Sequence, residues 1–200
     1  AGAELLREHG VNNTEYLLFG QPIPVDFNLR RDTRSVFVEG KWQVTPQLLV
    51  RSGVRHDRID GAGTRTSPSL SLRSDWPSIG GSVKASFAQG FKPPSFFALG
   101  LPVVLGGNPS LRPEQSTVGS VGYDQRMWND RASAGIALFK SKYKDLVTFD
   151  NTTGQTVNAN RVDIHGAELE GRVKITADLS VQAHFTRLFS HIVDSVEPLR

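Results

Sequence analysis

Apolar and polar residues alternate one by one along much of this chain. Between residues 36 and 44, valine and tryptophan occupy even positions, whereas Glu39, Lys41 and Gln43 occupy odd ones. Successive side chains of a β-strand point to opposite faces, so this period of two predicts strands with one apolar and one polar face. The same alternation recurs in residues 48–58, 69–73, 83–88, 166–173 and 181–186, and residues 114–125 and 132–147 are strand-like with a weaker pattern.

The lengths of these segments and of their connections indicate the topology of the strands. Several predicted strands run for about ten residues or more, whereas soluble strands usually have about five or six and a tilted membrane-crossing strand needs roughly 9–11. Short connections are expected near residues 45–46, 74–78, 126–131 and 175–178, and longer ones at 59–66, 91–113 and 148–158. Such alternation is typical of an up-and-down transmembrane barrel. We predict an all-β antiparallel meander of about nine strands, with residues 1–8 as the first and weakest, within a larger barrel.

The polarity of the two faces predicts which of them would meet lipid. Placing the charged face in hydrocarbon would cost roughly 2–4 kcal/mol for each Lys or Arg near the midplane. The predicted lipid-facing residues are Val36, Val38, Leu48, Val50, Val54, Leu70, Leu72, Val83, Ala85, Leu169, Val173, Val181 and Phe185. The predicted lumenal residues are Glu39, Lys41, Arg51, Arg55, Arg73, Lys84, Glu168, Glu170 and Arg172.

The three tryptophans lie in or beside predicted short connections. Trp42 precedes the first of them, Trp76 lies in the second and Trp128 in the third. An indole ring combines an apolar body with an N–H donor and therefore favours a membrane–water interface. This placement predicts an aromatic girdle at one rim of the barrel, with ordinary packing of aromatic rings at turns as the alternative.

Composition excludes several other kinds of protein. There is no run of 18 or more apolar residues, so no transmembrane helix is expected. The chain contains no cysteine, which excludes disulfides, thiolate metal sites and cysteine nucleophiles. Its net charge is only +3, and basic residues are scattered among acidic ones, which argues against nucleic acid as a partner. The five histidines have no metal-ligand spacing, and no catalytic motif is present, so no catalytic residue, metal or cofactor is expected.

The most specific motif lies in residues 87–116. It reads Phe-Ala-Gln-Gly-Phe-Lys-Pro-Pro-Ser from residue 87 and Gly-Asn-Pro-Ser-Leu-Arg-Pro-Glu-Gln-Ser from residue 107. A strand ends at Pro93-Pro94, and a new one is expected after Pro113. This arrangement resembles a signature of TonB-dependent outer-membrane receptors. Further similarity lies in 50–57, 66–69, 139–147 and 158–168, so the resemblance covers roughly residues 34–190.

The resemblance implies a location, a function and a set of partners. It implies the outer membrane of a Gram-negative bacterium and uptake of an iron–siderophore or a cobalamin-like ligand, without enzymatic activity. The implied partners are outer-membrane lipid, the receptor's own plug domain and the TonB complex, which the missing N-terminal part would contact. Residues 1–200 would form one partial barrel domain, without plug or final strands, of a barrel with about 22 strands. The alternatives are another outer-membrane barrel, such as a porin, and a secreted carbohydrate-binding β-sandwich.

Two groups of residues are candidates for a role in that function. Aromatic side chains in external loops would stack on a siderophore or a corrin-like ring, and lumenal arginines would attract an anionic ferric complex. The alternatives are packing of the aromatic rings within the loops or in an upper girdle, and pairing of the arginines with lumenal acids. The candidate ligand contacts are Phe91, Phe96, Phe97, Phe149, Arg55 and Arg161. The family-signature residues, expected mainly to specify the barrel, are Gly90, Phe91, Lys92, Pro93, Asn108, Pro109, Leu111, Pro113, Glu114, Asn158, Gly166 and Glu168.

Overall fold

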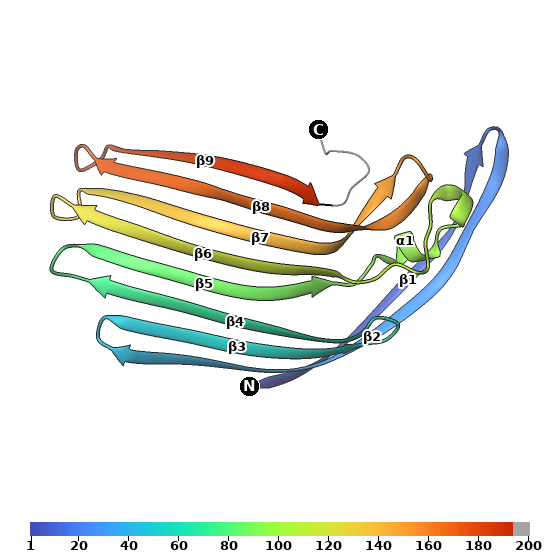
Figure 1. Ribbon diagram of the computed structural model, residues 1–200, viewed down its shortest axis with the longest axis horizontal. Coiled ribbons are helices and arrows are strands. Elements are labelled where there is room, and N and C mark those ends of the chain that lie inside the picture. The colour runs from blue at the N-terminus through green and yellow to red at the C-terminus, as the bar shows by residue number, and fades with distance from the viewer. Residues whose placement is uncertain (194–200) are drawn as a thin grey trace.

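A computed structural model describes residues 1–193, apart from the side chains of residues 159 and 160. It contains a single antiparallel sheet in which each strand pairs with its neighbours in the sequence (Figure 1). The predicted meander of about nine strands is therefore confirmed. The strands are β1 (Gly2–Leu18), β2 (Gln21–Thr45), β3 (Leu48–Ile59), β4 (Gly63–Trp76), β5 (Gly81–Lys92), β6 (Glu114–Met127), β7 (Ala132–Asp150), β8 (Gln155–Lys174) and β9 (Ser180–Val193).

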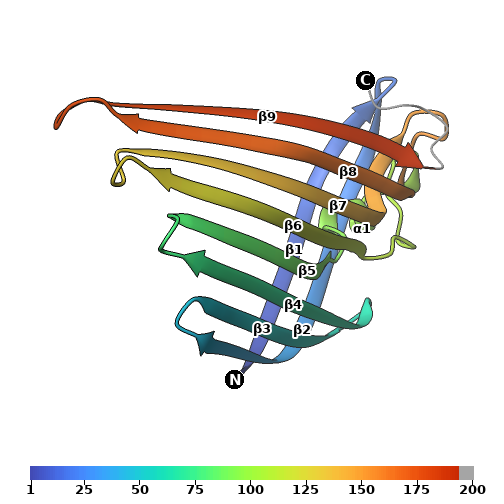
Figure 2. The same cartoon turned by 60° about the vertical axis from the view of Figure 1, so that its left-hand side comes forward.

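The sheet is curved, so it has a concave and a convex face (Figure 2). The excursion between β5 and β6, residues 93–113, lies over the concave face of β1 and β2, where Phe96 packs against Gly10. Strand register extends this assignment across the sheet, because paired residues share a face. Val38 pairs with Val54 on the convex face, and Arg51 pairs with Lys41 and Ser71 on the concave face.

The predicted division into apolar and polar faces is confirmed. The apolar set lies on the convex face, with Val36 58% and Phe185 60% exposed. The charged set lies on the concave face, and several of its members line one hollow there. Buried apolar side chains of the described residues are few and scattered, and include Val25, Ile59, Leu111 and Val162. Residues 1–193 hold no second sheet to enclose a core, so the β-sandwich alternative is wrong.

One end of the sheet carries the short connections that the sequence predicts. They are residues 46–47, 77–80, 128–131 and 175–179. All three tryptophans lie at this end, and Trp128 is in the third of these turns. Their common rim is therefore confirmed, while the interfacial girdle remains a prediction.

The opposite end differs from the sequence prediction. The connections expected at 59–66 and 148–158 are tight turns at 60–62 and 151–154, and the first strand continues to Leu18 rather than ending near residue 8. Residues 21–35 extend β2, which reaches 25 residues. Part of this extension alternates as well, because Ile23, Val25, Phe27 and Leu29 occupy every second position, so the sequence argument overlooked a strand pattern there. Elsewhere, strand pairing satisfies backbone donors and acceptors, so the ladders continue beyond the alternating segments.

The long excursion is the exception at that end. It contains α1 (Phe96–Gly100), capped by the Ser95 side chain, and the 3₁₀ turn η1 (Val103–Leu105). Within residues 1–193, no helix has both the length and the apolar character needed to cross a membrane.

Candidate functional site

Charged side chains gather on the concave face of the sheet. A hollow of about 750 Å³ there is lined by polar residues that include Arg51, Arg73, Lys84, Glu168 and Glu170. Some of these charges are paired, because Lys84 lies 2.5 Å from Asp124 and Arg73 lies 2.9 Å from Asp75. The neighbours Lys41 and Arg51 form no ion pair with any described residue, although Glu39 lies beside them on the same face.

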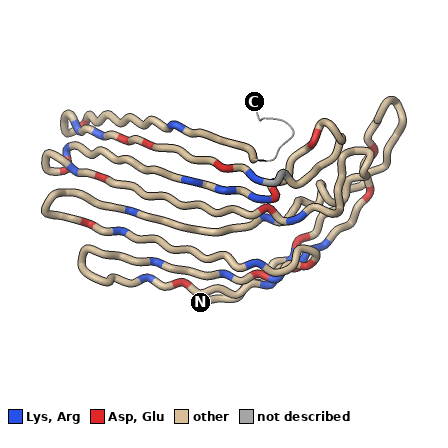
Figure 3. Tube along the Cα trace, viewed as in Figure 1, with Lys and Arg blue, Asp and Glu red and all other residues tan. Residues whose placement is uncertain are grey.

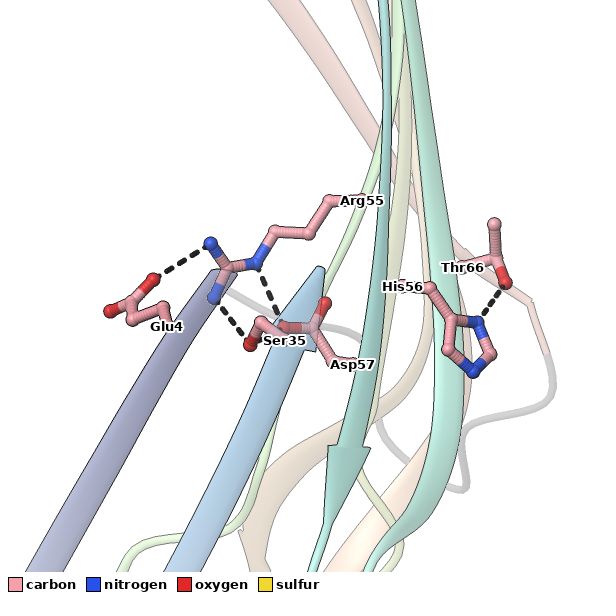
Figure 4. A network of polar contacts seen from close by, with 6 residues as sticks. All are labelled: Glu4, Ser35, Arg55, His56, Asp57 and Thr66. Atoms are coloured by element: carbon pink, nitrogen blue, oxygen red, sulfur yellow. Dashed lines mark hydrogen bonds and ion pairs between the residues drawn. The ribbon is translucent and has the colours of Figure 1, made fainter. Parts of the chain in front are cut away.

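Arg55 is held in a network on the same face (Figure 4). Its guanidinium donates to Glu4 at 2.9 Å, to Asp57 at 2.8 Å and to the Ser35 hydroxyl at 2.7 Å, and Ser35 donates to Asp57 at 2.5 Å. Asp57 is only 1% exposed. The network thus fastens β1, β2 and β3 together, and pairing with lumenal acids is the use that the structure shows for Arg55.

Arg31 anchors the excursion to the wall. It is 6% exposed, donates to the Pro94 carbonyl at 2.6 Å and lies 4.7 Å from the centre of the Phe96 ring. Glu8 lies 3.7 Å from its guanidinium. A buried arginine needs such partners to offset the loss of its hydration. The sequence argument missed Arg31, Ser35 and Asp57. For Arg31 a signal was available, because it continues the odd positions of the alternating run that Ile23 opens and Leu29 closes.

The signature residues Asn108, Glu114 and Asn158 join the excursion to the β7–β8 hairpin. Asn158 donates to the carbonyls of Arg112 and Asp145 and accepts from the Arg112 N–H, at 2.7–3.0 Å. Asn108 donates to the Thr156 carbonyl at 2.9 Å, and Glu114 accepts from the Val147 N–H at 2.9 Å. These side chains form hydrogen bonds with backbone groups, which supports the prediction that the motif mainly specifies the barrel fold.

The other signature residues lie around the same junction or on the concave wall. Lys92 is 3.6 Å from Glu114, and Leu111 is buried. Pro93 and Pro109 lie within the excursion, and Pro113 is buried at its end. Gly90 pairs with Ser116, whereas Glu168 lines the concave hollow and forms no ion pair with another described residue. At Gly166, an added Cβ would lie 2.6 Å from the Phe139 ring and would collide with the Arg187 carbonyl oxygen, so close approach requires glycine here.

The candidate ligand contacts divide between the two faces. Phe96 packs against the wall, whereas Phe97 and Phe149 are exposed, the latter beside Gly106 of the excursion. Phe91 and Arg161 share a face with Phe87 and Lys144, which is the convex one. The expectation that Arg161 is lumenal is therefore wrong. The register of β7 and β8 is constant along the pair, and Arg161 has the same odd parity as Leu169 and Val173. Counting along β8 from these two residues therefore already places Arg161 on the convex face.

Among residues 1–193, no three His, Asp or Glu side chains come together as a metal site. The geometry instead defines part of a barrel wall, with an apolar outside, a charged inside and one folded excursion at the far rim. Residues 4–197 match the family model described as TonB dependent receptor-like, beta-barrel, and the chain belongs to this family. A porin-like barrel is thereby set aside.

Solved structures of similar fold include siderophore receptors. The siderophore receptor PirA from Pseudomonas aeruginosa is 26% identical at a TM-score of 0.74, over 82% of this chain and 32% of that one. The ferric enterobactin receptor PfeA of the same organism, as a mutant bound to enterobactin, is 21% identical at 0.69, over 81% and 27%.

A copper transporter, OprC, shows the same fold at lower identity. It is 16% identical at a TM-score of 0.71, over 95% of this chain and 34% of that one. This chain thus spans about a third of the length of these proteins. No curated protein matches its sequence.

Proposed function

We propose that this chain is part of the wall of an outer-membrane receptor that takes up an iron–siderophore complex. The observation that carries the proposal is the alternation of faces, because an apolar convex side suits lipid and a charged concave side suits an enclosed aqueous lumen. The 26% identity to a siderophore receptor supports iron–siderophore over a cobalamin-like ligand. Residues 1–200 would form one partial barrel domain in the outer membrane of a Gram-negative bacterium.

In this proposal the wall contacts the plug domain and the incoming ligand, and it performs no covalent chemistry. Lys41 and Arg51, which form no ion pair with a described residue, would contact acidic groups of a plug domain in the lumen, and a segment outside this chain would contact the TonB complex. The exposed rings of Phe97 and Phe149 would contact the incoming ligand on the side of the excursion.

Transport by the complete receptor containing this segment tests the function. The receptor is expressed in a Gram-negative strain that lacks its own siderophore receptors, and uptake of radioactive iron is measured with a panel of ferric siderophores. We expect uptake with one of them and loss of uptake when TonB is deleted. Uptake of cobalamin or copper, with no ferric siderophore transported, would overturn the iron–siderophore assignment.

Single substitutions test the aromatic contacts in the same assay. Phe97→Ala and Phe149→Ala are expected to raise the siderophore concentration needed for half-maximal uptake roughly fivefold each, since an aromatic contact contributes about 1 kcal/mol beyond its buried area. Phe91→Ala is the matched control, because Phe91 lies at the same end of the sheet but on the convex face. Equal effects at all three positions would contradict the assignment of Phe97 and Phe149 as ligand contacts.

A further inference from the structure

The convex face of β7 changes character halfway along the strand. From the tight-turn end it presents Ala134, Ile136 and Leu138, and the next three side chains on that face are Lys140, Lys142 and Lys144. Successive side chains on one face are about 6.8 Å apart along a strand, so the change occurs within a single step. Figure 3 shows this basic run as adjacent blue segments along β7.

The neighbouring strands change at the same level. Leu138 pairs with Ala167 of β8, but Lys140 pairs with His165 and Lys144 with Arg161. On β6 the convex face passes from Val121 to Thr117 and Gln115. On β6, β7 and β8 the apolar belt therefore has a defined upper edge, and the lysine triad, Lys140, Lys142 and Lys144, begins at that edge. On β9 the first charge lies one step lower, at Arg187, which pairs with Ala167.

The wall supplies one carboxylate to the lysine triad, because Lys142 pairs with Asp163 across β7 and β8. The charges of Lys142 and Lys140 act on Asp163, which is also ion-paired with Arg161 at 2.6 Å, whereas none of the three lysines forms an ion pair of its own with another residue in the described part of the chain. Lys140, Lys142, Lys144 and Arg161 therefore carry more positive charge than this one carboxylate neutralises.

A hollow of about 360 Å³ accompanies the triad, and Lys142, Lys144 and Arg161 line it together with polar groups of β5 and β6. Pairing of β4 with β5 ends at Ser69 and Ala88, beside Pro68, which has no N–H to donate. The two strands separate beyond that point, and Arg65 and Thr66 form the other side of the hollow. The hydrogen-bonding side chains Gln89, Gln115 and Thr117 also face it.

We propose that the lysine triad binds the phosphate group of an anionic lipid in the leaflet that surrounds this end of the barrel. Ammonium groups bind phosphate as point charges, and the triad lies where a headgroup would sit if its acyl chains covered Leu138, Ile136 and Ala134. This inference rests on the membrane location proposed above. It adds a lipid site on the outside of the wall, separate from the proposed ligand path on the inside.

The test uses the complete receptor purified in detergent, with bound lipid counted by native mass spectrometry. Phosphatidylglycerol and phosphatidylcholine are titrated against the receptor and against the triple variant Lys140→Gln, Lys142→Gln, Lys144→Gln. The matched control is Lys41→Gln, Arg51→Gln, Arg172→Gln, which removes the same charge from the concave face. Heat-dependent gel mobility confirms that all three proteins are folded.

We expect the unaltered receptor and the control to prefer phosphatidylglycerol. Each basic residue near an anionic lipid surface contributes about fivefold, so the triad variant should bind this lipid roughly 100-fold more weakly and lose the preference. An unchanged preference in the triad variant, or an equal loss in the control, overturns the proposal. Displacement of the lipid by inorganic phosphate at the same concentration would assign the site to free phosphate instead and would overturn it as well.

One further measurement separates this inference from the proposed function. The receptor and the triad variant are reconstituted into phosphatidylcholine nanodiscs. Failure of the unaltered receptor to insert contradicts the membrane location and with it the lipid site. Insertion of both proteins, with no preference for anionic lipid in either, contradicts the lipid site alone.

Discussion

The convex and concave faces of this sheet use the same strands, yet they treat charge differently. On the concave face, charged residues occur along the whole sheet and several are ion-paired, as Arg55 is with Glu4 and Asp57. On the convex face, the belt that includes Leu72 and Leu138 carries no charge on β2–β8, Arg187 of β9 lies at its level, and the other basic residues lie above it. The comparison shows that polarity follows the surroundings of each face rather than the strand, and side chains one residue apart should therefore respond oppositely to the same change.

The largest effect is expected when the convex face meets water. The isolated 200-residue chain should aggregate without detergent, because a partial barrel exposes both its apolar wall and unpaired strand edges. Sedimentation with and without detergent measures this. A soluble monomer that unfolds cooperatively in water would break the assignment of the two faces.

A matched pair on β7 tests the faces directly. Leu138→Arg places a charge on the convex belt and should destabilise the receptor in lipid vesicles by roughly 2–4 kcal/mol. Ala137→Arg places the same side chain on the concave face, opposite Glu168, and should change stability by less than about 1 kcal/mol. Denaturant titration in vesicles gives both values, and equal losses would contradict the comparison.

Two glycines of β8 compare a crowded position with an open one. Gly166→Ala should cost roughly 1–3 kcal/mol, because its Cβ would meet the Arg187 carbonyl and the Phe139 ring. Gly171→Ala, with nothing within 4 Å of the new Cβ, should be neutral or slightly stabilising. The same titration applies, and a neutral Gly166→Ala would show that the sheet relaxes at this point.

The junction at the far rim should respond locally. Asn158→Ala removes three hydrogen bonds to backbone groups and should loosen residues 93–113 by about 1–3 kcal/mol. Hydrogen exchange and limited proteolysis of this segment measure the change. Asn151→Ala, in the exposed turn after β7, is the control, and matching protection in the two variants would refute a special role for Asn158.

The smallest effect concerns the turn at 151–154. The Thr153 hydroxyl and the Thr152 N–H donate to Asp150 and hold the pKa of its carboxyl below its ordinary value. The ionised form therefore stabilises the turn above the unfolded-state pKa of about 3.9, and this contribution is lost as pH falls through the lowered folded-state pKa. Exchange of the Thr152 amide should rise over that range beyond its intrinsic pH dependence, and Asp150→Asn should abolish the extra change.

The fold was largely predictable from alternation. The alternation of Val36, Val38 and Trp42 with Glu39 and Lys41 predicted both faces. Placing the charged residues in hydrocarbon would be costly, so the apolar residues must be the ones that face lipid. The extent of the strands was only partly predictable in this way. Residues 9–18 carry no such period, and only backbone pairing with β2 extends β1 through them. The alternation of Ile23, Val25, Phe27 and Leu29 with the residues between them did predict this part of β2 and was missed.

The sequence identified the motif residues of the candidate site but not their partners. Asn108, Glu114 and Asn158 were recognisable from their order along the chain. Their hydrogen bonds join segments up to 48 residues apart, and the sequence does not show which segments meet. Arg31 and Asp57 became prominent only through burial. The convex placement of Arg161 was predictable, because Arg161 shares the odd parity of Leu169 on β8. By itself, the sequence determined which faces are apolar and polar and which family the chain resembles, since these depend on local order. Only the tertiary structure decided which charges are paired and which stay uncompensated, because ion pairing depends on strands that meet across the sheet.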